Sequence, residues 1–135
     1  MKLQNSLYHI VSKEEVEAPV CHDMLDQGQV WRCIQLNADH VIFQAHFPGE
    51  PITPGVCIIQ IAKELLEDVV GEQLLICAVK NVKFLRVISP VEMPQITYVF
   101  EKIATDDTTK TVKVSTLVKC GDTPLAKLSF TCKPS

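Results

Sequence analysis

Hydrophobic residues follow a helical spacing in one long segment of the chain, residues 56–70. At about 100° per residue, one set of apolar side chains falls on a single face: Ile58, Ile61, Ala62, Leu65 and Val69. A second set widens this face beyond an ordinary surface stripe: Ile59, Leu66 and Val70. The pattern predicts a helix that is covered on most sides, with a narrow polar stripe that includes Gln60 and Glu64.

Apolar and polar residues alternate in most of the remaining chain, which is typical of β-strands. The segment at residues 7–18 is mixed and fits a strand or a short helix. Turn signals at DDTTK and GDTP separate the last three runs, so successive hairpins are expected. The predicted strands lie at residues 28–38 and 73–87 and around 96–100, 112–118 and 126–132. We therefore expect an α+β domain, with one central helix packed on an antiparallel sheet of five or six strands.

Length and composition narrow the classes of protein. The 135 residues favour a single domain over 1–135. The net charge of −3 without a basic block argues against broad nucleic-acid binding. Apolar runs are too short to span a membrane and the first ten residues lack a secretion signal, so we expect a cytoplasmic protein. Six cysteines and four histidines show no metal-ligand spacing, so we expect no metal site and reduced, buried cysteines.

The stretch HFPGEPITPGVCIIQIAKE, residues 46–64, joins a stiff loop to the predicted helix. Thr53 is expected as the N-cap, and Pro54 as the first helical residue, where a missing N–H costs nothing. The N–H groups of Gly55 and Val56 then remain unpaired at the positive end of the helix dipole. Two such donors, one of them on a residue without a side chain, can polarise a carbonyl group. Alternatively, TPG is only a good helix start whose donors are capped by Thr53 and water.

His46 is the histidine in the most rigid setting, directly before Phe47-Pro48-Gly49. Imidazole is the side chain best suited to accept a proton near neutral pH. Alternatively, His46 is a loop residue that hydrogen-bonds to the backbone.

The sequence HFPGEPITPGV resembles the signature of the hot-dog-fold (3R)-hydroxyacyl-acyl-carrier-protein dehydratases, which carry HFPG, a short spacer, and PGV at the start of the central helix. KFLRVISP at 83–90 is similar to a strand of that family, and the resemblance covers roughly 28–132. It implies that His46 removes the α-proton of a 3-hydroxyacyl thioester and that the Gly55 N–H binds the thioester carbonyl. It also implies a set of substrate-binding residues: Phe47, Pro48, Gly49, Pro54 and Val56.

The resemblance also implies partners. No cofactor is expected, because the substrate is carried on the phosphopantetheine of acyl carrier protein. The site is expected at the interface of a homodimer, or of a trimer of dimers, with His46 from one chain and the helix from the other. Neither nucleic acid nor a membrane is expected as a partner.

Position 60 departs from the family. The family's carboxylate follows the proline of PGV by six positions, and here that residue is Gln60, whose amide cannot act as a general acid. The family often has glutamine one turn later, where this chain has Glu64. Residues four apart share a helix face, so our hypothesis is that Glu64 supplies the proton through Gln60 or a bound water. Alternatively, Glu64 belongs to a solvated charged stripe.

Three basic residues lie close together in KNVKFLR: Lys80, Lys83 and Arg86. Strand alternation predicts that Lys83 lies on one face of the strand. The opposite face is predicted to carry Lys80, Val82, Phe84 and Arg86. Basic residues near a tunnel mouth would steer an acidic carrier protein; alternatively they form a solvated strand edge. Two other functions stay open: a hot-dog thioesterase that activates water with a carboxylate, and a non-catalytic subunit that binds acyl thioesters.

Overall fold

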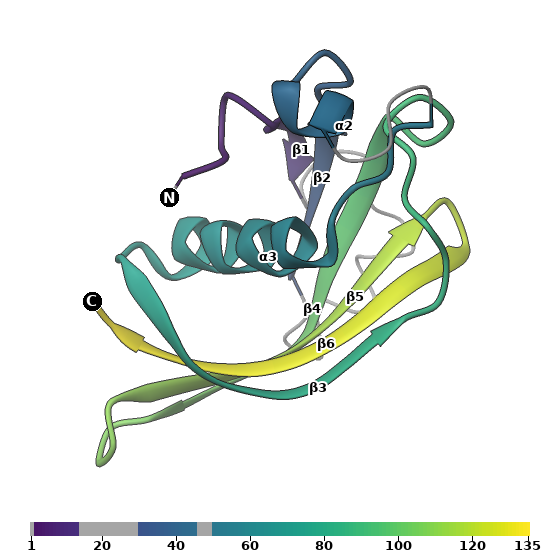
Figure 1. Ribbon diagram of the computed structural model, residues 1–135. Coiled ribbons are helices and arrows are strands. Elements are labelled where there is room, and N and C mark those ends of the chain that lie inside the picture. The colour runs from purple at the N-terminus through teal and green to yellow at the C-terminus, as the bar shows by residue number, and fades with distance from the viewer. Residues whose placement is uncertain (1, 14–29, 46–49) are drawn as a thin grey trace.

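The computed structural model describes residues 2–13, 30–45 and 50–135. In these ranges the strands form one six-stranded antiparallel sheet, in the order β1-β2-β4-β5-β6-β3 (Figure 1). The sheet curves around helix α3, which lies across its concave side (Figure 1). The helices are α2 (Val41–Ala45) and α3 (Gly55–Val70). The strands are β1 (Tyr8–Lys13), β2 (Val30–Leu36), β3 (Leu74–Phe84), β4 (Gln95–Asp106), β5 (Thr111–Cys120) and β6 (Thr123–Pro134).

Helix α3 is the centre of the hydrophobic core. Its buried apolar residues face the sheet: Cys57, Ile58, Ile61, Ala62, Leu65 and Leu66. On β5 every second residue is buried against them: Val112, Val114, Thr116 and Val118. Burying one such aliphatic side chain contributes about 1.5–3 kcal/mol. The hydroxyl of Tyr98 on β4 donates to the Ile58 carbonyl oxygen at 3.0 Å, which links the sheet directly to the helix.

The predicted α+β architecture, one helix on an antiparallel sheet, is confirmed. The helix begins at Gly55, one residue earlier than the apolar pattern indicated. The described part of the mixed segment 7–18 forms β1, and residues 14–18 lie outside the described ranges. The short helix α2 was not predicted, because five residues are too few to show a helical period.

Strand β3 lies at one edge of the sheet and contains two register shifts, between Ile76 and Ala78 and between Val79 and Asn81. Each bulge adds one residue and so reverses the alternation of faces. Val82 and Phe84 pair with residues of β6 that are buried against the core, whereas Lys80 sits at the second bulge. The prediction that Lys80 shares their face is therefore wrong, and Arg86 follows the end of the strand.

Candidate active site

Helix α3 starts without a side-chain cap. Pro54 is the N-cap, with extended backbone angles of φ −62° and ψ 145°, and among the described residues there is no side-chain capping hydrogen bond. The prediction that Thr53 is the N-cap is wrong, because the extended Pro54 itself precedes the first helical residue. The N–H groups of Cys57 and Ile58 bond the Pro54 carbonyl at 3.0 and 3.1 Å. Within the described ranges, the N–H groups of Gly55 and Val56 have no hydrogen-bond partner.

Thr53 adds a buried polar group beside this helix start. Its N–H donates to the Ile88 carbonyl oxygen at 2.8 Å, which fixes the loop against the segment that follows β3. The residue is 4% exposed, and its hydroxyl has no hydrogen-bond partner among the described residues. A buried polar group without a partner costs about 1–3 kcal/mol. A ligand atom or water at the helix start would remove that cost.

The ring of Phe84 occupies the space next to Gly55. A Cβ atom on Gly55 would lie 2.8 Å from Cζ and 2.9 Å from Cε2 of Phe84, closer than real side chains come. The glycine is therefore needed for this contact as well as for access to its N–H. Phe84 is 48% exposed, so its ring can move when a ligand approaches the helix start. Sequence reasoning placed Phe84 in the family-like strand but did not identify this contact.

The predicted base lies outside the described residues, as does the rest of its motif: His46, Phe47, Pro48 and Gly49. The described chain resumes at Glu50 and borders a cavity of about 470 Å³. Residues 50–52 form one side of this cavity, and the other side is formed by Val87, Ser89, Val91 and Glu92. The cavity thus lies beside the loop that leads to the uncapped helix start.

Gln60 and Glu64 are in contact, as their spacing predicts. The amide nitrogen Nε2 of Gln60 donates to Oε2 of Glu64 at 2.8 Å. Glu64 is only 3% exposed, so the alternative that it belongs to a solvated stripe is wrong. Its carboxylate also accepts the backbone N–H of Leu3 at 2.7 Å, the backbone N–H of Gln4 at 2.8 Å, and the hydroxyl of Tyr8 at 3.0 Å.

These four donors replace water around a buried carboxylate, and bonds to a charged acceptor are the strong kind. Two of them come from the segment before β1 and one from Tyr8, the first residue of β1, so Glu64 ties this part of the chain to helix α3. Burial, followed by the charge of Glu64 and its hydrogen bond, raises the pKa of the Tyr8 hydroxyl well above its ordinary value. Sequence reasoning missed these partners, because nothing in the local pattern connects residues about sixty positions apart.

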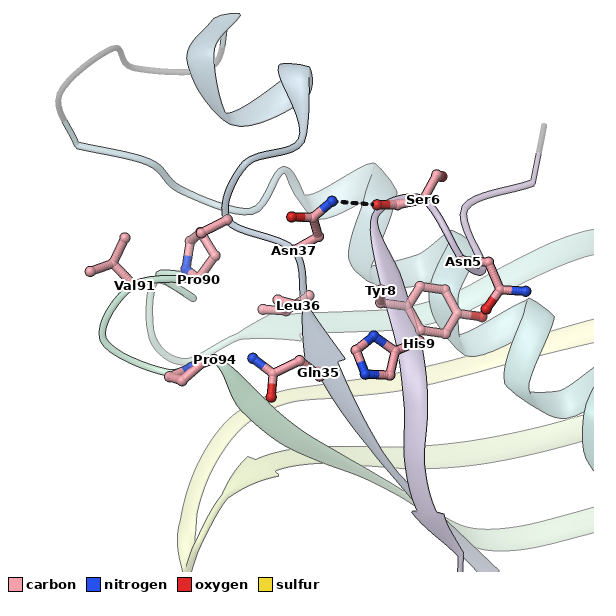
Figure 2. A pocket seen from close by; sticks show the side chains of 11 residues that line it. Asn5, Ser6, Tyr8, His9, Gln35, Leu36, Asn37, Pro90, Val91 and Pro94 are labelled. Carbon is pink, nitrogen blue, oxygen red and sulfur yellow. Dashed lines mark hydrogen bonds between the residues drawn. The ribbon is translucent and has the colours of Figure 1, made fainter.

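A cavity of about 740 Å³ lies beside β1, β2 and the turn before β4 (Figure 2). Polar side chains reach its wall, among them His9 and Asn37, and the amide of Asn37 donates to the Ser6 carbonyl oxygen at 2.9 Å (Figure 2). Of the predicted site residues that the structure describes, none lines it. Tyr8 borders this cavity and also bonds Glu64.

The three predicted docking residues, Lys80, Lys83 and Arg86, are all exposed. Lys80 lines a cavity of about 600 Å³ together with Lys102 and Lys113. This cavity, which we call the outer trough, lies on the side of the sheet that faces away from α3, because Lys113 alternates with buried residues of β5. Hydroxyl groups complete its polar lining: Ser115, Ser129 and Thr131.

The cysteines divide by burial. Cys57 and Cys132 are buried, and burial raises the pKa of both thiols, that of Cys132 to about 11. Cys77 is exposed, so the expectation of burial is wrong there. Among the described residues, no group of three or more histidine, cysteine or acidic side chains could hold a metal ion. In the same ranges, no helix has the length and apolar character needed to cross a membrane.

Comparison with known proteins identifies relatives. A family model described as ApeI-like, ApeI dehydratase, matches residues 23–119. The 3-hydroxyacyl-[acyl-carrier-protein] dehydratase FabZ of Clostridium acetobutylicum is 41% identical over an aligned stretch that covers 36% of this chain and 40% of the relative. The FabZ of Latilactobacillus sakei is 32% identical over 50% of this chain and 54% of the relative. The chain thus spans about half the length of the curated relatives it matches.

Solved structures confirm the hot-dog fold. The HP0420 homologue of Helicobacter felis superposes with a TM-score of 0.61 at 12% identity, over 98% of this chain and 91% of that one. The dehydratase heterocomplex ApeI:P of Xenorhabdus doucetiae gives a TM-score of 0.57 at 16% identity, over 78% of this chain and 87% of that one.

Proposed function

Because the chain belongs to the ApeI-like dehydratase family, we propose that it removes water from a (3R)-3-hydroxyacyl thioester on acyl carrier protein and leaves a trans-2-enoyl thioester. The main support is the helix start: Gly55 and Val56 present two N–H groups without a partner among the described residues. These donors follow an HFPG sequence in the region that the family model matches.

In this proposal the thioester carbonyl accepts hydrogen bonds from the N–H groups of Gly55 and Val56. Fixed donors of this kind stabilise the charge that develops on the oxygen, and one donor is worth about 10²–10³ in rate. His46 takes the proton from C2, the electron pair forms the C2–C3 double bond, the C3–O bond breaks, and the departing hydroxyl takes a proton back from the His46 imidazolium and leaves as water. Pro54 fixes the backbone at the helix start, while three loop residues shape the entrance to the site: Phe47, Pro48 and Gly49.

We propose that the active form is a dimer with a second copy of this chain, alone or within a trimer of dimers. Apolar residues are exposed along the edge strand β3 and beyond it: Leu75, Val79, Phe84, Leu85 and Val87. Pairing two β3 edges would cover this surface and satisfy the edge backbone groups. Sedimentation should give two or six times the chain mass of 15.1 kDa, and Val79→Lys should lower the measured mass. A monomeric wild type with full activity would refute this part.

The ApeI:P heterocomplex suggests a variant of the same proposal, in which the second hot-dog subunit is a different chain. Gln60 favours this variant, because a partner could supply a carboxylate that position 60 lacks. The purified chain would then bind an acyl thioester without turnover, and activity would appear only when the second subunit is added.

We propose that acyl carrier protein docks on basic residues of β3 and its surroundings. Lys80 is supported best, because it shares the outer trough with Lys102 and Lys113, and the described residues of that lining include no carboxylate. Charge reversal of these three lysines should weaken carrier binding and leave turnover of a short pantetheine thioester unchanged. Reversal of Lys83 and Arg86 is the parallel test on the other predicted residues. Unchanged carrier affinity in both variants would contradict docking on this surface.

The decisive assay follows the product by mass spectrometry with several 3-hydroxyacyl thioesters. We expect an enoyl thioester without an added cofactor, and a loss of about 10²–10⁴ in rate for His46→Ala. In the cell we expect this reaction to take place in the cytoplasm. Free acid as the product would instead indicate a thioesterase. Tight binding without any product, with or without a second subunit, would indicate a non-catalytic acyl-thioester-binding protein.

A further inference from the structure

The ring of Phe84 lies against Gly55 at the start of helix α3, the place where we propose that the thioester carbonyl binds. We infer that this ring selects the substrate by the carbon atom next to that carbonyl, C2. It leaves room for an unbranched CH₂ group and disfavours acyl thioesters that carry a methyl branch at C2. This selectivity rests on the proposed function and deepens it, because it names the class of acyl chain. Phe84 is then a specificity-determining residue.

The position of the ring follows from its contact with Gly55. A Cβ atom on Gly55 would lie 2.8 Å from Cζ and 2.9 Å from Cε2 of Phe84. Among the described residues, and apart from the helix backbone and the chain neighbours of Gly55, the three atoms nearest to that position all belong to this ring. Because bonds along the chain are about 1.5 Å long, the ring edge lies within about 6 Å of the Gly55 nitrogen. Phe84 therefore bounds the space beside this N–H donor.

Hydrogen bonds fix the backbone that carries the ring. The residue after Phe84, Leu85, donates its N–H to the carbonyl oxygen of Leu125 on β6 at 2.8 Å. Further along, the carbonyl oxygen of Ile88 accepts the N–H of Thr53 at 2.8 Å, in the loop directly before the helix. The same segment is thus held to the sheet and to the helix start. Only a rotation of the half-exposed Phe84 side chain can move the ring away.

A thioester bound at the helix start brings C2 into the space that the ring bounds. A carbonyl oxygen that accepts the Gly55 N–H lies about 2.9 Å from the nitrogen. C2 is two bonds from that oxygen, so it lies within about 5.5 Å of the same nitrogen, a range similar to that of the ring edge. Carbon atoms pack best at about 3.5–4.0 Å from one another. A CH₂ group fits beside the ring at such distances, whereas a branch methyl adds a further carbon to the same space.

The side chains next to the contact favour the acyl side of the thioester over the pantetheine side. Val56 follows Gly55 and Leu85 follows Phe84, and both are apolar and exposed. The pantetheine arm carries amide groups, which lose free energy in apolar surroundings unless they are hydrogen-bonded. C2 and the carbons beyond it have no such requirement. We therefore place the acyl chain, and not the pantetheine arm, against the ring.

A branched substrate would be disfavoured in one of two ways. Either the Phe84 ring rotates into solvent and loses its contact with Gly55, or the carbonyl group moves off the N–H donors. One added carbon in an apolar site changes kcat/KM by about 10–200-fold. We therefore expect wild type to prefer the unbranched substrate by at least about tenfold.

The experiment compares two 3-hydroxyacyl pantetheine thioesters that differ only by a methyl group at C2, with both C2 epimers of the branched one. Phe84→Ala should reduce the preference for the unbranched thioester at least about fivefold, because the branched thioester gains space. Phe84→Leu, which keeps most of the apolar volume, should give an intermediate preference and serves if Phe84→Ala does not fold.

Leu85→Ala is the matched control. Leu85 adjoins Phe84, is 44% exposed against 48%, and belongs to the same surface proposed for the dimer. It is not among the atoms nearest to the Cβ position on Gly55. Leu85→Ala should therefore keep the preference of wild type. An equal change of preference in both variants would mean that weaker dimers, and not the ring, cause the effect, and would overturn the role of Phe84.

A double-mutant cycle tests the same space from the protein side. The methyl group of Gly55→Ala points at the Phe84 ring, as the Cβ distances show. Gly55→Ala should therefore lower turnover of the unbranched thioester less in a Phe84→Ala background than in wild type. Fully additive losses would mean that the ring does not bound this space.

Binding without turnover separates this selectivity from the proposed dehydration. Inert analogues with an amide in place of the thioester keep the carbonyl and C2, and calorimetry gives their affinities. The backbone ¹⁵N signals of Gly55 and Val56 should shift when the unbranched analogue binds. If wild type forms no enoyl product but prefers the unbranched analogue, and Phe84→Ala removes that preference, only the proposed function fails. Equal affinities, no binding of either analogue, unshifted signals, or a preference that Phe84→Ala leaves intact would overturn the role of Phe84.

Discussion

The two buried tyrosines provide a direct measure of the charged acceptor at Glu64. The hydroxyl of Tyr8 donates to a carboxylate oxygen of Glu64, and the hydroxyl of Tyr98 donates to the carbonyl oxygen of Ile58, each at 3.0 Å. Tyr8 is 1% exposed and Tyr98 is 0% exposed, so removing either hydroxyl leaves a similarly buried ring. The two Tyr→Phe substitutions therefore differ mainly in the charge of the acceptor.

The expected magnitudes follow from that difference. A hydrogen bond to a charged group contributes about 1.5–3 kcal/mol and a neutral one about 0.5–1.5 kcal/mol. We expect Tyr8→Phe to lower the free energy of unfolding by about 2 kcal/mol. We expect Tyr98→Phe to lower it by about 1 kcal/mol. Urea denaturation followed by circular dichroism measures both, with equal m values as the check that only stability changed. Equal losses, or a smaller loss for Tyr8→Phe, would show that the carboxylate does not act as a charged acceptor.

Three further predictions follow from the structure. Gly55→Ala should change the free energy of unfolding by less than about 1 kcal/mol, because the half-exposed ring of Phe84 can move aside and alanine favours a helix. Turnover should nevertheless fall at least tenfold, because the displaced ring and the new methyl group crowd the helix start. Unchanged initial rates would contradict this prediction. Burial raises the pKa of both tyrosines above 10, so the folded state keeps protons that the unfolded state loses, and stability should fall as the pH rises above about 10. Ultraviolet titration should show phenolate from these tyrosines only at the pH where circular dichroism reports unfolding. Phenolate that forms before unfolding would contradict this prediction. A thiol reagent at pH 8 should modify the exposed Cys77 well before Cys132, whose pKa is about 11; peptide mass spectrometry that finds equal rates would refute the burial argument.

Much of the fold could be predicted because it depends on local periodicity. The broad apolar face of 56–70 predicted α3, and alternation predicted the later strands. The bulges of β3 could not be predicted, because a single added residue leaves the composition of the strand unchanged while it moves Lys80 from one face to another. The N-cap was misassigned for a similar reason: Thr53 and Pro54 both suit a helix start, and only the backbone angles decide between them.

Like the fold, the candidate site could be predicted from the sequence only where it depends on local spacing. The spacing of Gln60 and Glu64 predicted their contact, because residues four apart in a helix are neighbours. The burial of Glu64 depends on partners in the segment before β1, and the space beside Gly55 depends on Phe84. Both are contacts between distant parts of the chain, which one sequence without a periodic signal does not reveal. The role of His46 stays a prediction, because it lies outside the described residues.

The tie between Glu64 and the segment before β1 also has a consequence for the order of folding. Its bonds join residues 56 to 61 positions apart, and bringing the ends of so long a flexible stretch together costs about 3–4 kcal/mol of chain entropy. That cost is recovered only after α3 has formed and presents the carboxylate. The hairpins of β4, β5 and β6 need much shorter closures. They should therefore form early, and the docking of residues 3–8 should be among the last events. Refolding experiments should then detect a kinetic intermediate with a native-like sheet and an undocked N-terminal segment.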